Sequence, residues 1–197
     1  IIYLFIMNIL NFKSPILIAT TFAVIASILG AVDGVIVRVL TNELHPFVIV
    51  FFRCLFGLIF VIPLFFNNTN IFKSNFFYLH FVRAFLKIFS LVLLFYAIKY
   101  SILSDVISIT FVTPIFIILG SILFLNEQPT VNHILLSFAG LVGVLIILKP
   151  AQGVLASPLM LALLAAIISS IIQLILKFMS TKDTTNTLVA WNLICIV

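Results

Sequence analysis

The chain alternates between long apolar stretches and short polar breaks. Each stretch is close to the roughly 20 residues that an α-helix needs to cross about 30 Å of bilayer hydrocarbon. The complete stretches are Ile16–Leu40, Phe47–Phe66, Phe76–Ile98, Ile102–Leu125, Val131–Leu148 and Leu159–Met179. Another begins at Leu188 and runs to Val197. The pattern therefore predicts six membrane-spanning helices and the beginning of a seventh.

The breaks between these stretches contain residues that end helices or form turns. They are Thr41–Glu43, Asn67–Asn70, Tyr100–Ser101, Asn126–Pro129, Lys149–Pro150 and Thr181–Asn186. The stretches do not alternate apolar and polar residues, as the strands of a transmembrane barrel do. We therefore expect an all-α fold, a polytopic membrane helix bundle with little mass outside the membrane.

Composition supports a membrane location and excludes other classes of protein. Hydrophobic residues make up 64% of the chain and charged residues 8%, whereas a soluble domain carries roughly 25% charged residues. The net charge of +5 comes from ten basic residues that are scattered along the chain. They form no cluster or aromatic platform, so we expect a lipid bilayer as the partner and no nucleic acid.

The distribution of basic residues predicts the orientation of the chain. Under the positive-inside rule, the side richer in Lys and Arg faces the cytoplasm. The side that holds the N-terminus carries Lys13, Lys73, Lys177 and Lys182, and the other side carries Arg38, Lys99 and Lys149. We therefore expect the N-terminus in the cytoplasm.

Two segments of the chain resemble each other and indicate an internal repeat. When Ala23–Asn42 is aligned with Ala162–Thr181, several apolar positions are identical and Arg38 aligns with Lys177. The second copy begins five spans after the first, so it enters the membrane from the opposite side. This is the inverted repeat of many secondary transporters.

The ends of the sequence suggest a fragment. Leu188–Val197 would cover about 15 Å, half of a bilayer. The chain does not begin with Met, and Met7 is a natural candidate for the true start. We expect an N-terminal segment over residues 1–13, a first five-helix repeat over 14–150 and the truncated start of a second repeat over 151–197.

Several motifs resemble one transporter family. Phe51–Phe66, FFRCLFGLIFVIPLFF, resembles the second helix of an EamA-type domain, and Phe95–Pro150 is similar to the most recognisable stretch of that domain. The matching elements there are Tyr96–Tyr100, Pro114, Glu127, Gly140 and Gly143. LHPFVIVFFR and FLNEQPT are also similar to S-adenosylmethionine uptake carriers.

The resemblance covers Ser14–Val197 and implies a member of the drug/metabolite transporter superfamily. Such proteins have ten helices, arranged as two inverted five-helix repeats around a central cavity for small metabolites. By this comparison the last three helices are missing.

Four charged residues lie well inside apolar stretches, away from the stretch ends: Asp33, Arg53, Arg83 and Lys87. Each costs roughly 2.5–3.5 kcal/mol at a helix centre on insertion scales, so we expect them to face the bundle interior and to have partners. Asp33 and Arg53 lie at similar distances from the turn near Glu43, which predicts an ion pair that is either structural or a substrate contact. Arg83 and Lys87 share one helix face. The excess of cations favours a substrate with a carboxylate or phosphate.

Four uncharged residues are further candidates for contact with a substrate: Thr110, Thr113, Pro114 and Gln173. Pro114 removes one backbone hydrogen bond and frees the carbonyl of Thr110, and a helix broken at mid-membrane often lines a substrate cavity. Thr110, Thr113 and Pro114 therefore either form a kink or line the cavity. Gln173 either lines it or makes an interhelical hydrogen bond.

The sequence contains no H-E-x-x-H, G-x-S-x-G or P-loop motif. His45, His80 and His133 lie near segment ends without the spacing of metal ligands, and we expect them at the membrane interface. Glu127 is expected to serve as a cap or loop anchor. We therefore expect neither an enzyme nor a metal or other cofactor.

Repeat and resemblance together favour a secondary transporter of the bacterial inner membrane that works by alternating access. Its expected substrate is a small metabolite, amino-acid-like or nucleoside-like, such as S-adenosylmethionine. Two alternatives remain open: a truncated remnant without function, and a seven-helix receptor-like membrane protein.

Overall fold

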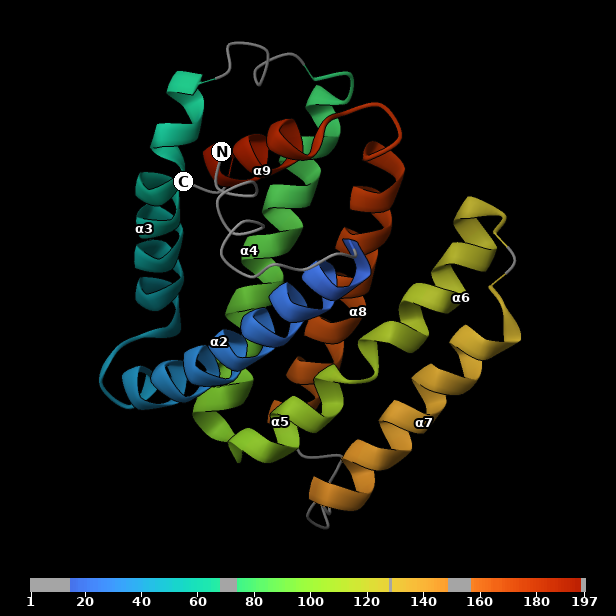
Figure 1. Cartoon of the computed structure of the whole chain (residues 1–197). Helices are drawn as coiled ribbons and strands as arrows, with labels where there is room; N and C mark the ends of the chain where they lie inside the picture. The colour runs from blue at the N-terminus through green and yellow to red at the C-terminus, as the bar shows by residue number, and fades with distance from the viewer. Residues whose placement is uncertain (1–14, 68–73, 128, 149–156, 196–197) are drawn as a thin grey trace.

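The computed structural model describes residues 15–67, 74–127, 129–148 and 157–195, and the regular elements in these ranges are all helices (Figure 1). They are α2 (Pro15–Glu43), α3 (Pro46–Asn67), α4 (Phe77–Tyr100), α5 (Leu103–Thr110), α6 (Thr113–Leu125), α7 (Val131–Leu148), α8 (Ser157–Met179) and α9 (Thr185–Ile194). The predicted all-α helix bundle is confirmed.

Length and hydropathy show that the bundle spans a membrane several times. Four candidate spans lie within the described ranges: Thr20–Glu43, Phe77–Tyr100, Leu103–Leu125 and Pro158–Met179. Shorter apolar helical segments cover Pro46–Ile59 and Ile134–Gly143. Large apolar side chains cover much of the outer surface. In water they would make the protein aggregate, whereas lipid tails are a suitable solvent for them.

The centre of the bundle is the pair formed by α4 and α8, which have the most extensive contact in the structure. Small residues let the two backbones approach, among them Ala84 on α4 and Ala162 and Ala165 on α8, all almost fully buried. Ser90 Oγ donates to the carbonyl of Ala165 (3.0 Å) and lies 2.9 Å from Ser169 Oγ. In lipid, where apolar burial between helices gains little, this packing and these hydrogen bonds hold helices together.

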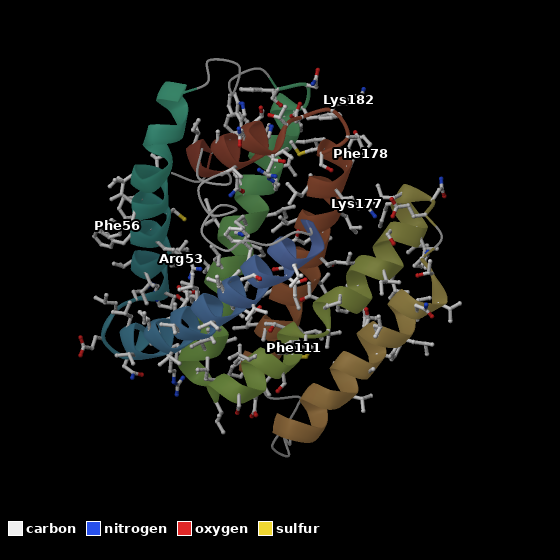
Figure 2. The ribbon with its side chains drawn as sticks, viewed as in Figure 1. Arg53, Phe56, Phe111, Lys177, Phe178 and Lys182 are labelled. Carbon is white, nitrogen blue, oxygen red and sulfur yellow. The ribbon has the colours of Figure 1, made fainter. Side chains whose placement is uncertain are left out.

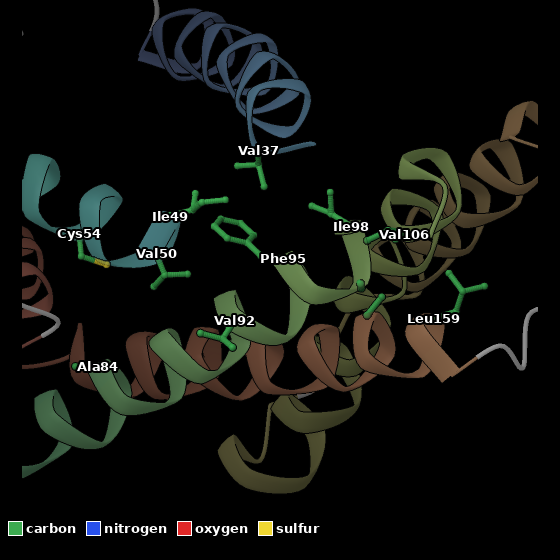
Figure 3. Close-up of a cluster of buried hydrophobic side chains, with 12 residues drawn as sticks. Val37, Ile49, Val50, Cys54, Ala84, Val92, Phe95, Ile98, Val106 and Leu159 are labelled. Carbon is green, nitrogen blue, oxygen red and sulfur yellow. The ribbon is translucent and has the colours of Figure 1, made fainter. Parts of the chain in front are cut away.

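A cluster of buried apolar side chains joins this pair to α2 and α3 (Figure 3). Phe95 on α4 is 2% exposed and points toward Val37 of α2 and Ile49 of α3. On the other side of the pair, Gly120 of α6 lies so close to α8 that an added Cβ would overlap Leu174 Cδ1.

The fourth predicted span is broken where proline interrupts it. α5 ends at Thr110 and α6 begins at Thr113, with Pro114 in its first turn. Between them the chain forms tight turns. The N–H of Phe111 donates to the carbonyl of Ser108 (3.3 Å), and the N–H of Val112 donates to the carbonyl of Ile109 (3.0 Å). The predicted break at Pro114 is confirmed, and its cause is the missing N–H and the ring clash with the preceding turn.

Contacts between helix ends show which ends lie on the same side. The Arg38 guanidinium, near the end of α2, donates to the carbonyls of Ile98 and Ser101 (2.9 Å to Ser101) at the end of α4. Asp183, just after α8, accepts hydrogen bonds from Ser74 and Asn75, just before α4. α2 therefore runs in the same direction as α4, and α8 runs in the opposite direction. Opposite directions for α2 and α8 are what an inverted repeat requires.

Candidate functional site

A cavity of about 640 Å³ lies between α4, α6, α8 and α9. We call it the α4–α8 cavity. Its volume is within the range of small-molecule sites, roughly 300–1,000 Å³. Its walls combine apolar side chains with cations, amides and hydroxyls: Arg83, Lys87, Ile117, Ile172, Gln173, Leu176, Lys177, Ser180, Thr185, Leu188, Val189 and Asn192. Three of the residues predicted to contact a substrate, Arg83, Lys87 and Gln173, meet in this cavity.

Arg83 is held firmly in the wall of the cavity. The residue is 2% exposed, and its Nη2 donates to the carbonyl of Leu188 on α9 (2.6 Å). Its Nε is buried and has no hydrogen-bond partner among the described residues. Arg83 thus offers a fixed guanidinium with a donor still free.

Lys87 lies one helical turn further along α4 and lines the same cavity. Within the described part of the chain it makes no ion pair. Gln173 enters the cavity from α8, which favours the first of the two roles predicted for it. The cavity lining contains no acidic side chain.

A second cavity, of about 650 Å³, lies between α6, α7 and α8. Pro114, Ser121 and Glu127 line it, and Lys177 and Ile117 line both cavities. Lys177 on α8 forms an ion pair with Glu127, which follows the end of α6, and it lies between the two helices in Figure 2. This ion pair therefore stands at the border between the cavities and ties the end of α6 to α8.

Helix α6 ends in a way that directs Glu127 toward Lys177. Asn126 adopts the left-handed conformation (φ 50°), which asparagine tolerates better than most residues. The N–H of Glu127 then donates back to the carbonyl of Ser121 (3.2 Å). The chain turns sharply at this point, which brings the Glu127 carboxylate to α8.

Asp33 and Arg53 form the predicted ion pair between α2 and α3; Figure 2 labels Arg53. Arg53 Nη1 lies 2.7 Å and 2.9 Å from the two carboxylate oxygens. The guanidinium carbon also lies 5.8 Å from the ring centre of Phe95. The side chains remain 42% and 45% exposed, so the described residues do not enclose the pair as the sequence predicted. The reason is that the pair lies where α2 and α3 meet, and neither residue lines the two cavities described above.

Thr110 and Thr113 flank the break between α5 and α6 and line neither of these two cavities. The hydroxyl of Thr110 donates to the carbonyl of Ile107 (2.7 Å), one turn earlier in its own helix. Of the two roles predicted for them, the structure favours the kink. Pro114 starts α6 and also lines the second cavity.

Comparison with known proteins identifies the family. Residues 17–149, about two thirds of the chain, match the EamA-like transporter family. This chain belongs to the EamA-like transporter family. No solved structure matches this EamA-like chain.

Curated relatives of the EamA-like chain carry the names of two kinds of transporter. It is 24% identical over 166 residues to an S-adenosylmethionine uptake transporter of Rickettsia felis, covering 84% of the chain and 56% of the relative. A protein of the same name from Rickettsia bellii is 25% identical over 166 residues, covering 84% of the chain and 57% of the relative. A riboflavin transporter of Brucella anthropi is 26% identical over 148 residues, covering 75% of the chain and 52% of the relative. The chain thus spans little more than half the length of these relatives.

The EamA-like chain also contains a polar cluster around the buried His80 and Asp183 that the sequence did not predict. We call it the clasp; it consists of Ser74, Asn75, His80 and Asp183. Ser74 Oγ donates to Asp183 Oδ2 (2.6 Å), and the backbone N–H and side-chain amide of Asn75 reach Oδ1 at 2.9 Å and 3.0 Å. His80 Nε2 lies 2.9 Å from Ser74 Oγ and 3.4 Å from Asp183 Oδ2. The clasp ties the turn after α8 to the beginning of α4.

The structure shows that the His80 side chain is buried inside the protein near the start of α4, and its position at the membrane interface stays a prediction. His80 is 0% exposed and stacks on Trp191 of α9, with the ring centres 5.6 Å apart. Ser74 and Asp183 satisfy Nε2 of this buried ring, whereas Nδ1 has no hydrogen-bond partner among the described residues. Ser74 and Asn75, two residues of helix-capping type before α4, are the sequence feature that indicates a polar cluster here. The sequence does not indicate that their partner is Asp183.

Hydrogen bonds tune the acidity of Asp183, which lies outside the membrane-spanning segments. Burial alone would raise its pKa. The hydrogen bonds from Ser74, from the backbone and side chain of Asn75 and from His80 outweigh burial, so the pKa of Asp183 lies below its ordinary value. The carboxylate is thus ionised at neutral pH and accepts all of these bonds.

Proposed function

We propose that this EamA-like protein is a secondary transporter that moves a small metabolite across a bacterial inner membrane by alternating access. The observation that supports this most strongly is the α4–α8 cavity, which has the volume of a metabolite site and is lined in part by the candidate membrane spans of α4, α6 and α8. Membership of the EamA-like transporter family supports transport rather than catalysis.

We propose an amino-acid-like or nucleoside-like substrate. Relatives named for S-adenosylmethionine and riboflavin support an organic molecule with both polar and flat aromatic parts. The amides of Gln173 and Asn192 can hydrogen-bond the edge of a heterocycle, while Ile172 and Leu176 offer an apolar wall. When such a molecule leaves water, the amides replace its hydrogen bonds to water and the apolar side chains cover its apolar surface.

Alternating access requires elements that can take two arrangements. Two features of the structure support such a movement. The break at Pro114 separates α5 from α6 and offers a point at which this span can bend. The ion pair of Lys177 and Glu127 joins α6 to α8 at the border of both cavities, and its exposed side chains can separate at low cost.

Transport in reconstituted vesicles tests the proposal. The protein is placed in liposomes and the entry of radiolabelled S-adenosylmethionine and riboflavin is measured against empty liposomes. Gln173→Leu should reduce uptake about tenfold or more, because an amide that can hydrogen-bond the substrate is lost. The matched control is Asn42→Leu, which removes an exposed amide far from the cavity and should leave uptake unchanged.

Two results would contradict the proposal. Uptake no faster than in empty liposomes, by protein shown to be folded, would exclude these two substrates. Equal uptake by Gln173→Leu and by Asn42→Leu would show that the α4–α8 cavity is not the route.

A further inference from the structure

We infer that Arg83 and Lys87 form a binding site for an anionic group, a carboxylate or a phosphate, on the molecule that this protein transports. This inference rests on the proposed passage of substrate through the α4–α8 cavity, and it adds the chemical class of the substrate. Its basis is the charge inventory of the chain together with the geometry of Arg83.

Each acidic residue of the chain either has a polar partner of its own or lies at the opposite end of α4 from Arg83. The sequence contains five Asp and Glu residues, and the structure describes each of them. Asp33 pairs with Arg53, Glu127 pairs with Lys177, and Asp183 accepts hydrogen bonds in the clasp. Glu43 ends α2 and Asp105 lies in the first turn of α5, both at the opposite end of α4 from Arg83. The chain thus provides no carboxylate for the two cations in the cavity.

Arg83 is arranged as a receptor for an anion. Its bond to the carbonyl of Leu188 uses one nitrogen and fixes the direction of the planar guanidinium, while the buried Nε has no partner in the described part of the chain. A guanidinium donates in a fork that matches the two oxygens of a carboxylate or phosphate. A free donor on a side chain that is 2% exposed has few other uses.

Lys87 adds a second, more mobile charge on the same face of α4. It lies four residues after Arg83, so both cations line one side of the cavity. Opposite them are the amides of Gln173 and Asn192 and the hydroxyls of Ser180 and Thr185. These groups can bind the rest of a polar metabolite once the anion is in place.

The depth of the site favours a soluble metabolite over a lipid headgroup. Lys87 is ten residues beyond the start of α4 at Phe77, which corresponds to about 15 Å along the helix. This is close to the middle of a hydrocarbon layer about 30 Å thick. Lipid phosphates lie at the surface of that layer, whereas transported molecules bind near its midplane.

Binding of simple oxyanions tests the inference without any need for transport. The full chain is placed in nanodiscs of phosphatidylcholine alone, and sodium phosphate or sodium acetate is titrated against sodium chloride at constant ionic strength. The readout is the fluorescence of Trp191, the only tryptophan in the sequence, which lies on α9 next to the lining residue Asn192. We expect a saturable response to phosphate or acetate and not to chloride.

Variants of matched charge identify the residues responsible. Lys87→Gln should weaken oxyanion binding about tenfold or more, as expected for loss of a charge-assisted contact. Lys87→Arg should retain binding, which controls for folding. Lys99→Gln removes the same charge at the far end of the same helix, where the ammonium contacts the Tyr100 ring, and should bind like the wild type.

Each remaining outcome is decisive. The absence of a saturable response, or equal binding by Lys87→Gln and Lys99→Gln, overturns the inference. A response to phosphatidylglycerol in the nanodiscs, with none to soluble phosphate or acetate, also overturns it and makes the site a lipid site. Oxyanion binding that depends on Lys87 in a protein that fails to transport would contradict the proposed function and leave the anion site standing.

Discussion

At the scale of single residues, the four charges inside apolar helices have different surroundings. Asp33 and Arg53 neutralise each other between α2 and α3, at distances typical of strong charge-assisted hydrogen bonds. Arg83 and Lys87 face a cavity without a carboxylate. Charges in a membrane are expensive, so the paired set suits a structural role and the unpaired set suits a ligand.

Arg53→Leu should lower the amount of protein in the membrane several-fold, because it strands the Asp33 carboxylate in an apolar environment. Adding Asp33→Asn removes the stranded charge and should restore the level. The measurement is the protein level in the membrane fraction for the wild type, both single variants and the double variant. If Arg53→Leu alone leaves the level unchanged, the ion pair contributes nothing to folding.

Gly120 is a second residue whose role follows from packing. An added Cβ would overlap Leu174 Cδ1 on α8, so Gly120→Val should push α6 away from α8 and lower the thermal stability in detergent. Leu174→Ala in the same chain should recover part of the loss, because it removes the clashing atoms. Gly140→Val is the control, since a Cβ there meets nothing within 4 Å. Equal losses for both glycines would contradict this account.

At the scale of elements, the sequence predicted what depends on local pattern. The lengths of the apolar stretches predicted the helices, and the polar breaks predicted where they end. Pro114 predicted the break between α5 and α6. The Asp33–Arg53 pair was also predictable. In a hairpin of two helices, residues at equal distances from the turn lie at similar depths in the membrane. Family resemblance supplied the rest of the functional hypothesis.

Contacts between distant elements were not predictable in this way. Ser74 and Asp183 are separated by more than a hundred residues, and no local rule joins them. The same is true of Arg83 with the carbonyl of Leu188, since any backbone carbonyl could accept that bond. The α4–α8 cavity depends on how α9 lies across α4, which periodicity does not determine (Figure 1).

The clasp should make the junction of α4, α8 and α9 sensitive to acid. The pKa of Asp183 is lowered in the folded protein, so its stabilising effect is fully present above its ordinary pKa, near 3.8, and is lost as pH falls through the lowered value. Trp191 stacks on His80 of the clasp, so its fluorescence should change in a transition below about pH 4. Asp183→Asn should lack this acid transition. Superimposable pH curves for the two proteins would contradict the assignment.

At the scale of the whole molecule, contacts group the helix ends into two sets. One set contains the starts of α4 and α9 and the ends of α6 and α8, joined by the clasp and by Lys177 with Glu127. The other contains the end of α2, the start of α3 and the end of α4, joined by Arg38 with Ser101 and by His45 with Tyr96. α4, which has one end in each set, therefore passes from one set to the other. Under the positive-inside rule, we expect the first set to face the cytoplasm.

Cysteine labelling in intact cells tests this orientation. In a chain with Cys54→Ala and Cys195→Ser, Asn42→Cys places a thiol at the exposed end of α2, and Thr181→Cys places one at the exposed turn after α8. A membrane-impermeant maleimide should label Asn42→Cys in intact cells and Thr181→Cys after the cells are permeabilised. The reverse pattern would show that the N-terminus faces outward and that the small excess of basic residues misled the prediction. Equal labelling of both in intact cells would place the ends of α2 and α8 on one side, and it would contradict the opposite directions of these helices on which the inverted repeat depends.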